Sequence, residues 1–237
     1  MRFGFNRQVV YLSLCPPDGD KAKCDLFQGV VTGQDTFASF SPLANVNAAG
    51  YDSYATVTGN ADLLLFASSR VSPVRLYFAP AVDGQFKTPQ ELDTGISPHA
   101  SNEPYLLADG RTFYFGATVS NNPQNWELYR ATGRPPDFKG ATLVPGLGDP
   151  ANDFAPVPTE DELEIFFASA RAPSQALDLW AAKRSSPDQP FGAPVRLPAL
   201  SGSDNDYPTW ISPDACELYF IKKTGQVAQA YVARRGG

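Results

Sequence analysis

The stretch SDNDYPTWISPDACELYF, Ser203 to Phe220, gathers three carboxylates among aromatic side chains. Asp204, Asp206 and Asp214 could act as acid and base catalysts, bind a hard metal ion through oxygen, or accept hydrogen bonds from a sugar. The same residue type also stabilises turns, because an Asp side chain accepts hydrogen bonds from backbone amides two or three residues further on. The elements that carry these residues decide between the two interpretations.

The chain repeats a pattern of short apolar strands with a period near 50 residues. Copies of one aromatic strand read LLLFASSR, TFYFGATV, EIFFASAR and ELYFIKKT. Alignment on these copies places four residues, separated by 50, 51 and 53 positions, at one point of the repeat: Asp52, Asn102, Asp153 and Asp206. Units of this length with four strands each are typical of β-propeller blades.

The repeat predicts an all-β fold, a single five-bladed β-propeller domain over residues 1–237 with four-stranded antiparallel blades. The 22 prolines and 19 glycines agree with a chain rich in turns. We place the blades at about residues 1–50, 51–100, 101–150, 151–203 and 204–237, and the last blade is expected to have three strands. The outer strand should follow a Phe and end near a Leu in four pairs: Phe37 and Leu43, Phe86 and Leu92, Phe138 and Leu143, Phe191 and Leu197.

Two motifs resemble known propeller repeats. SPDACELYF (212–220) is similar to the Ser-Pro-Asp-Gly-x-x-Leu-Tyr-Phe signature of TolB-like bacterial propellers, with Ala215 where Gly is usual. FFASARAPSQALDLWAAKR (166–184) resembles the Phe-x-Ser-x-Arg continuation of cell-envelope members of that family. The resemblance implies a protein-binding or scaffolding role in the bacterial cell envelope, although TolB has six blades and this chain shows five.

In a propeller, the turn into the innermost strand lies at one end of the central channel. We therefore predict a polar ligand-binding ring at the channel mouth, formed by Asp52, Asn102, Glu103, Asp153 and Asp206. Such a ring would favour cationic or hydroxyl-rich ligands. A residue type that recurs in every blade can equally be a turn former, and the structural role is the more common one.

A second group of aspartates is assigned to the turns between the first and second strands. DG and related pairs are hairpin signals, and they place Asp62, Asp109, Asp161 and Asp214 at these turns. The Asp214 of the opening motif is therefore interpreted as a turn residue, and its Asp206 as a ring residue.

Two other functions stay open. Glycoside hydrolysis needs at least two acids across the scissile bond, and only Asp52, Glu103 and Asp153 offer carboxylates from successive blades. A lectin-like propeller would stack a saccharide on an exposed aromatic ring, for which Trp126 and Trp180 are candidates beside Trp210. We predict no catalytic residue, and burial between blades is the more common role of such tryptophans.

No cofactor and no metal site are predicted. His99 is the only histidine, which excludes a zinc site built from several histidines and leaves no motif for a nucleophilic triad. The net charge of −6 argues against a nucleic-acid partner.

The cysteines bear on the compartment. Cys15 and Cys24 flank a loop between two strands, so they can form a disulfide or remain free thiols, and Cys216 is left unpaired. A disulfide would indicate an oxidising compartment. The chain has no apolar run of transmembrane length and no recognisable export signal. We expect a monomeric extracytoplasmic protein, periplasmic or on the cell surface, that binds an envelope protein or peptide, or a saccharide.

Overall fold

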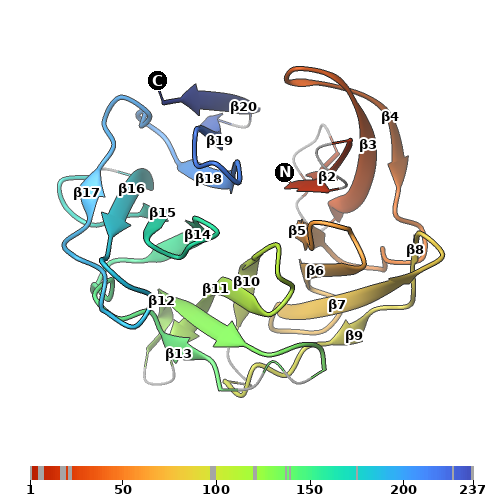
Figure 1. Cartoon of the computed structure of the whole chain (residues 1–237), viewed down its shortest axis with the longest axis horizontal. Coiled ribbons are helices and arrows are strands. Elements are labelled where there is room, and N and C mark those ends of the chain that lie inside the picture. Colours follow the sequence, from red (N-terminus) through yellow and green to blue (C-terminus); the bar gives the residue numbers. More distant parts are fainter. Residues whose placement is uncertain are drawn as a thin grey trace. The chain divides into compact units, whose positions relative to one another are not determined.

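The structure, a computed structural model, describes residues 2–4, 8–16, 20, 23–96, 100–119, 122–136, 138, 140–174, 176–225 and 227–235. Within these residues the chain is all-β, and its small antiparallel sheets are those of a five-bladed β-propeller (Figure 1). The strands of each sheet follow in chain order, and the last sheet has three strands, as predicted. No helix in the described part of the chain could span a membrane.

The strands of the blades have the following bounds. The first blade contains β1 (Arg2–Gly4), β2 (Val9–Leu14), β3 (Asp25–Gly33) and β4 (Thr36–Pro42). The second contains β5 (Asp52–Val57), β6 (Leu63–Ser68) and β7 (Arg75–Val82), with β8 (Gln85–Phe86) and β9 (Gln90–Glu91) both paired to β7. The third contains β10 (Ser101–Leu106), β11 (Thr112–Val119), β12 (Asn122–Thr132) and β13 (Thr142–Leu143). The fourth contains β14 (Asp153–Pro158), β15 (Glu164–Ser169), β16 (Asp178–Lys183) and β17 (Val195–Arg196), and the last contains β18 (Asp206–Ile211), β19 (Glu217–Thr224) and β20 (Val227–Arg234).

The chain divides into two compact units. The first unit comprises Met1–Phe113 and Ala131–Ala141, and the second comprises Tyr114–Arg130 and Thr142–Gly237. Each unit has its own apolar core between successive blades. The first core includes Tyr11, Leu26, Phe66 and Phe86, and the second includes Tyr114, Leu128, Phe167, Trp180 and Phe191. Trp180 is thus a packing residue, and Trp210 is also buried.

One hydrogen bond fixes the outer strand of the first four blades. The amide of an aliphatic residue donates to a carbonyl of the third strand in the pairs Leu43 to Leu26, Leu92 to Leu76, Val144 to Leu128 and Leu197 to Leu179, at 2.8–2.9 Å. The third pair corrects our prediction of Leu143. Val144 is 3% exposed, whereas Leu143 is 49% exposed, so the aliphatic residue that donates this bond follows the Phe by six positions in each of the first four blades.

A bulge in the innermost strand corrects the ring position of the third blade. Tyr54, Glu103 and Ala155 have positive φ angles of 56°, 55° and 50°, and therefore occupy equivalent positions. The residue equivalent to Asp52 and Asp153 is then Ser101, not Asn102. The backbone hydrogen bonds agree with this alignment. The amide of Asp52 donates to the carbonyl of Cys24 and that of Ser101 to the carbonyl of Val74, and each acceptor directly precedes the third strand of the preceding blade.

The turns between first and second strands use side-chain capping. Asp109, Asp161 and Asp214 each accept a hydrogen bond from the amide two residues on, which confirms them as turn residues. The equivalent residue in the second blade is Asn60, because its Oδ1 accepts the amide of Asp62. Asp62 also lies in this turn, as predicted, but it accepts a hydrogen bond from the hydroxyl of Thr58 instead of capping the turn.

The residue after each capping side chain adopts the left-handed conformation, which is strained for residues that carry a Cβ atom and relaxed for glycine. Gly110 fills this position in the third blade with φ of 65°, whereas Ala215 fills it in the last blade with φ of 57°. We expect Ala215→Gly to raise the free energy of unfolding by about 1 kcal/mol. The left-handed conformation costs an L-residue about 1–2 kcal/mol, and removing this strain is partly offset by the larger conformational entropy of glycine in the unfolded chain. Urea unfolding followed by tryptophan fluorescence measures the change. Gly110→Ala should lower stability, and a destabilised Ala215→Gly protein would contradict the assigned turn geometry.

Candidate functional site

The ring aspartates of the second and fourth blades are held by an arginine 18 residues further along the chain. Arg70 Nη2 donates to Asp52 Oδ1 at 2.8 Å and to the carbonyl of Val46 at 2.9 Å, while its Nε donates to Ser68 Oγ at 2.8 Å. The guanidinium also lies 4.6 Å from the ring centre of Tyr77. We call this Asp–Ser–Arg arrangement the arginine clamp.

The fourth blade repeats the clamp. Arg171 Nη2 donates to Asp153 Oδ2 at 2.6 Å and to the carbonyl of Leu147 at 2.8 Å, and its Nε donates to Ser169 Oγ at 2.9 Å. The carboxylates of Asp52 and Asp153 belong to residues with no exposed surface. Both acids therefore tie the inner strand to the preceding turn, which is a structural role.

Burial changes the acidity of Asp153. Desolvation raises its pKa to about 7, although the hydrogen bond from Ser169 and the charge of Arg171 act in the opposite direction. The nearby carboxylate of Glu127 raises the pKa further. Asp153 Oδ1 has no hydrogen-bond partner among the described residues, so the clamp satisfies only one of its two oxygens.

Asp206, the ring residue of the last blade, is also buried but is held differently. It accepts a hydrogen bond from the amide of Gly202, and Lys222 stands opposite it on β19 where the clamps have a serine. Burial raises the pKa of Asp206, while the Gly202 amide and the charge of Lys222 lower it. The predicted ring residues of the second unit, Asp153 and Asp206, are therefore both engaged within their own blades.

The third blade lacks the clamp altogether. The clamp positions are occupied by Ser101, Ala117 and Val119, so the aspartate, the serine and the arginine are missing together. This is the break in the repeat that a specific binding site requires, and it lies beside two tyrosines.

Those tyrosines and two predicted residues form the candidate site. Tyr51 donates its hydroxyl hydrogen bond to Asn102 Oδ1 at 2.8 Å, and its ring contacts Tyr54 edge-on with centroids 6.4 Å apart. Burial raises the pKa of Tyr51, and the negative charge of Glu103 raises it further. We call Tyr51, Tyr54, Asn102 and Glu103 the tyrosine site.

Access to the tyrosine site is through Tyr54, which is 39% exposed, whereas Glu103 is 6% exposed. The backbone of Tyr54 is fixed by Ser13, whose Oγ accepts its amide at 3.1 Å and also bonds Ser53 Oγ at 2.9 Å. The structure thus brings three predicted residues, Asp52, Asn102 and Glu103, to one region of the first unit. The tyrosines were missed, although their placement on both sides of Asp52 is visible in the sequence.

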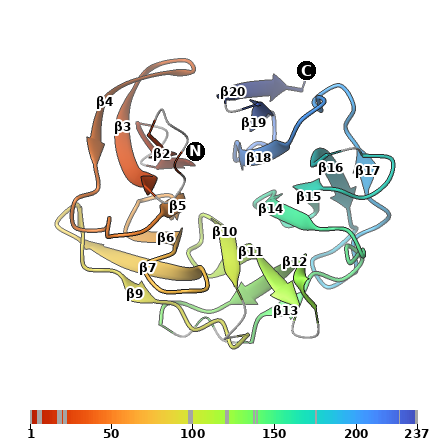
Figure 2. The ribbon, with the colours of Figure 1, turned by 180° about the vertical axis from the view of Figure 1, so that it is seen from behind.

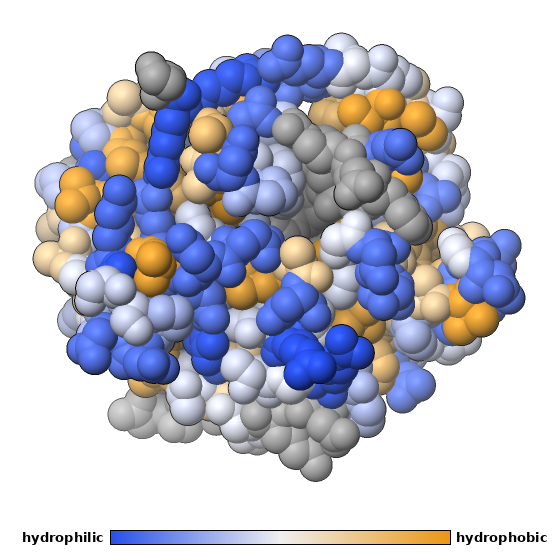
Figure 3. Space-filling view, in the orientation of Figure 1, coloured by the Kyte–Doolittle hydropathy of each residue, from blue (hydrophilic) through white to orange (hydrophobic). Residues whose placement is uncertain are grey.

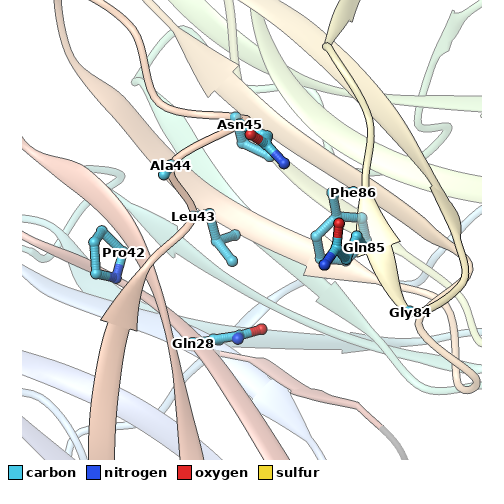
Figure 4. Close-up of a pocket in the computed structure, with 9 residues that line it drawn as sticks. Gln28, Pro42, Leu43, Ala44, Asn45, Gly84, Gln85 and Phe86 are labelled. Atoms are coloured by element: carbon cyan, nitrogen blue, oxygen red, sulfur yellow. The ribbon is translucent and has the colours of Figure 1, made fainter.

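A shallow pocket of about 240 Å³ lies elsewhere in the first unit (Figure 4). Side-chain amides of Gln28, Asn45 and Gln85 line it together with the apolar side chains of Leu43 and Phe86. Amides both donate and accept hydrogen bonds, so this pocket can bind a neutral, hydroxyl-bearing group.

No group of three His, Cys, Asp or Glu side chains in the described ranges is arranged to hold a metal ion, and His99 lies outside those ranges. Cys15 and Cys24 form a disulfide, as one of our two interpretations predicts, and Cys216 is an exposed free thiol.

Comparison with known proteins finds similarity in structure only. No family model and no curated protein sequence matches the chain. TolB from Acinetobacter baumannii is similar with a TM-score of 0.60 and 13% identity over 98% of this chain, which spans 51% of that protein. A putative TolB from Agrobacterium tumefaciens has a TM-score of 0.59 and 14% identity over 99% of this chain and 73% of its own. A thermostable family-43 glycoside hydrolase has a TM-score of 0.62 and 12% identity, covering 98% of this chain and 88% of its own. At these identities the likeness shows the propeller fold and not a function.

Removing the cation of a clamp should be more harmful than removing both partners. We expect Arg171→Met to lower the free energy of unfolding by about 3–5 kcal/mol, because it leaves Asp153 buried without its cation, and the double variant with Asp153→Asn to recover at least half of that loss.

Because the native pKa of Asp153 lies near 7 and the unfolded value near 3.8, the native state keeps a proton that the unfolded chain releases, so the stability contributed by this group falls as pH rises from 4 to 7. The Arg171→Met defect should therefore be smaller at pH 5 than at pH 8 in urea titrations. An equal defect at both pH values would argue against the buried acid.

Thiol counting tests the disulfide. Under denaturing, non-reducing conditions Ellman's reagent should detect one thiol per chain, that of Cys216, and three after reduction. Reduction should also lower the free energy of unfolding by about 2–3 kcal/mol, since the bond closes a short loop. Three thiols before reduction would contradict the Cys15–Cys24 bond.

Proposed function

We propose that the chain is a non-enzymatic binding propeller of the bacterial cell envelope that holds a protein or peptide at the tyrosine site. The observation that carries this proposal is the loss of the arginine clamp in the third blade, whose Asn102 and Glu103 lie against Tyr51 of the second blade. Clamped carboxylates are used within the fold. The tyrosine site departs from the repeat, and the ring of its Tyr54 is exposed to a partner.

The chemistry of the tyrosine site favours a cationic partner. The face of an exposed tyrosine attracts an ammonium or guanidinium group, and a nearby carboxylate strengthens that attraction where water is partly excluded. Tyr54 supplies the exposed ring, and the negative charge of Glu103 acts close enough to shift the pKa of Tyr51. A lysine or arginine side chain of a partner protein meets both requirements.

The proposed location is extracytoplasmic. The Cys15–Cys24 disulfide supports an oxidising compartment such as the periplasm or cell surface. On the face shown in Figure 3 the apolar residues are scattered among hydrophilic ones, which suits a monomer that binds its partner through a small site. The structural similarity to TolB proteins is compatible with this role and does not establish it.

A saccharide is the second candidate ligand, and the pocket of Figure 4 favours it. Three amide side chains beside Leu43 and Phe86 match the mixture of hydroxyl groups and apolar ring faces that a sugar presents. Glycoside hydrolysis has less support, because Asp52 and Asp153, two of its three candidate acids, are buried and paired with arginines.

The test compares two exposed residues of the first unit. Tyr54→Ala should reduce capture of its principal partner from a cell-envelope extract at least fivefold in quantitative mass spectrometry, because the exposed ring is lost. Val82→Ala, which truncates a side chain that is 49% exposed away from the tyrosine site, should leave capture unchanged. Equal capture by both variants would count against the tyrosine site, and glycan-array binding that is lost in Gln85→Ala would favour the saccharide instead.

A further inference from the structure

The last blade presents an open strand edge. β20 pairs with β19 on one side, and no described strand pairs with its other side (Figures 1 and 2). In each of the other four blades the equivalent third strand carries an outer strand. An unpaired edge of eight residues offers a row of backbone donors and acceptors that natural proteins usually cover or interrupt.

The positions of β20 can be matched to β16 through their shared registers. Phe167 pairs with Trp180 as Phe220 pairs with Tyr231, so Leu179 is equivalent to Ala230. The amide of Arg184 donates to Leu163 as that of Arg235 donates to Cys216, so these arginines are also equivalent. The carbonyl of Leu179 accepts the amide of Leu197 from the outer strand, and Ala230 is the corresponding acceptor in the last blade.

Three comparisons show what an outer segment covers. Trp180 is 6% exposed, whereas Tyr231 is 42% exposed. Leu179 is fully buried, whereas Ala230 is exposed. The Arg184 side chain is 2% exposed and lies 4.3 Å from the ring centre of Phe191, which belongs to the segment leading into the outer strand. The Arg235 side chain is 48% exposed.

We propose that the edge of β20 binds an extended segment of a partner protein, which completes the blade as a fourth strand. The segment carries a Phe that stacks on Arg235 and, six residues later, a Leu or Val whose amide donates to the carbonyl of Ala230. This spacing is that of the chain's own outer segments: Phe37 to Leu43, Phe86 to Leu92, Phe138 to Val144 and Phe191 to Leu197.

The composition of the edge selects a partner segment over a second copy of β20. Two β20 strands could pair with one another, but VAQAYVAR contains no Phe to stack on Arg235. Arg234 pairs with Glu217 and Arg235 pairs with Glu164, so binding at this edge depends on backbone pairing and on the Phe rather than on unpaired charge. The inference concerns a different surface from the tyrosine site and stands independently of it.

The probe is a fluorescein-labelled peptide with the sequence of residues 188–200, DQPFGAPVRLPAL, which holds the Phe and the Leu of the fourth blade. Fluorescence anisotropy against the full chain should show saturable 1:1 binding. Phe191→Ala in the peptide and Arg235→Ala in the protein should each weaken binding at least fivefold, and the two changes together should be no worse than either alone. Arg234→Ala, whose side chain pairs with Glu217, is the matched control and should weaken binding less than twofold.

Leu197→Pro in the peptide removes the amide that should meet Ala230 and should abolish binding without altering the protein. Absence of binding by the parent peptide, or additive effects of Phe191→Ala and Arg235→Ala, would overturn the proposal. Sedimentation of the protein alone provides a further check, since a dimer that Ala230→Pro dissociates would place a second copy on the edge instead.

Discussion

The buried ion pair between the first residue of the inner strand and an arginine 18 positions later constrains the second and fourth blades. In the second and fourth blades a single guanidinium neutralises the carboxylate, bonds the serine opposite and caps a turn carbonyl. An isolated buried carboxylate would cost several kcal/mol, so the arginine must be in place whenever the strand is. The clamp thus couples the inner strand, the second strand and the preceding turn, and it gives the recurring acids of these two blades a structural role.

Blades that lack the clamp contribute residues to both proposed binding surfaces. The third blade replaces all three clamp residues and brings Asn102 and Glu103 against Tyr51. The last blade keeps Asp206 but sets Lys222 opposite it and leaves β20 with an open edge. Repetition supplies a stable scaffold, while a specific site needs one blade that departs from its copies.

The sequence predicted the propeller because aromatic strands and turn residues recur at a period too regular to be chance. It could not place individual residues where the backbone carries a bulge. The extra residue of the inner strand shifts Glu103 into the position of Tyr54, so Ser101 rather than Asn102 stands where the aspartates stand. Likewise Asn60, and not Asp62 in the same turn, provides the capping oxygen, because capping requires a hydrogen-bond acceptor and not a charge. The pairing of the clamp arginines with the aspartates could not be predicted from the sequence motif. The two residues are 18 positions apart, and they meet only because of the register between the first and second strands.

A second polar network shows how neighbouring blades of the second unit are joined at the opposite ends of their strands. Glu162, held at a positive φ angle of 58°, accepts hydrogen bonds from Tyr114 and Arg130 of the third blade and lies 3.4 Å from Arg184 of its own blade. Burial raises the pKa of Glu162, but the bonds from Arg130 and Tyr114 outweigh it and hold the pKa below its usual range. Arg184 in turn is covered by Phe191, so the outer segment shields this arginine of the network from water. A segment bound at the open edge of β20 would therefore do more than form backbone hydrogen bonds. An outer segment excludes water from the charged groups beneath it, and the lower local dielectric strengthens their interactions.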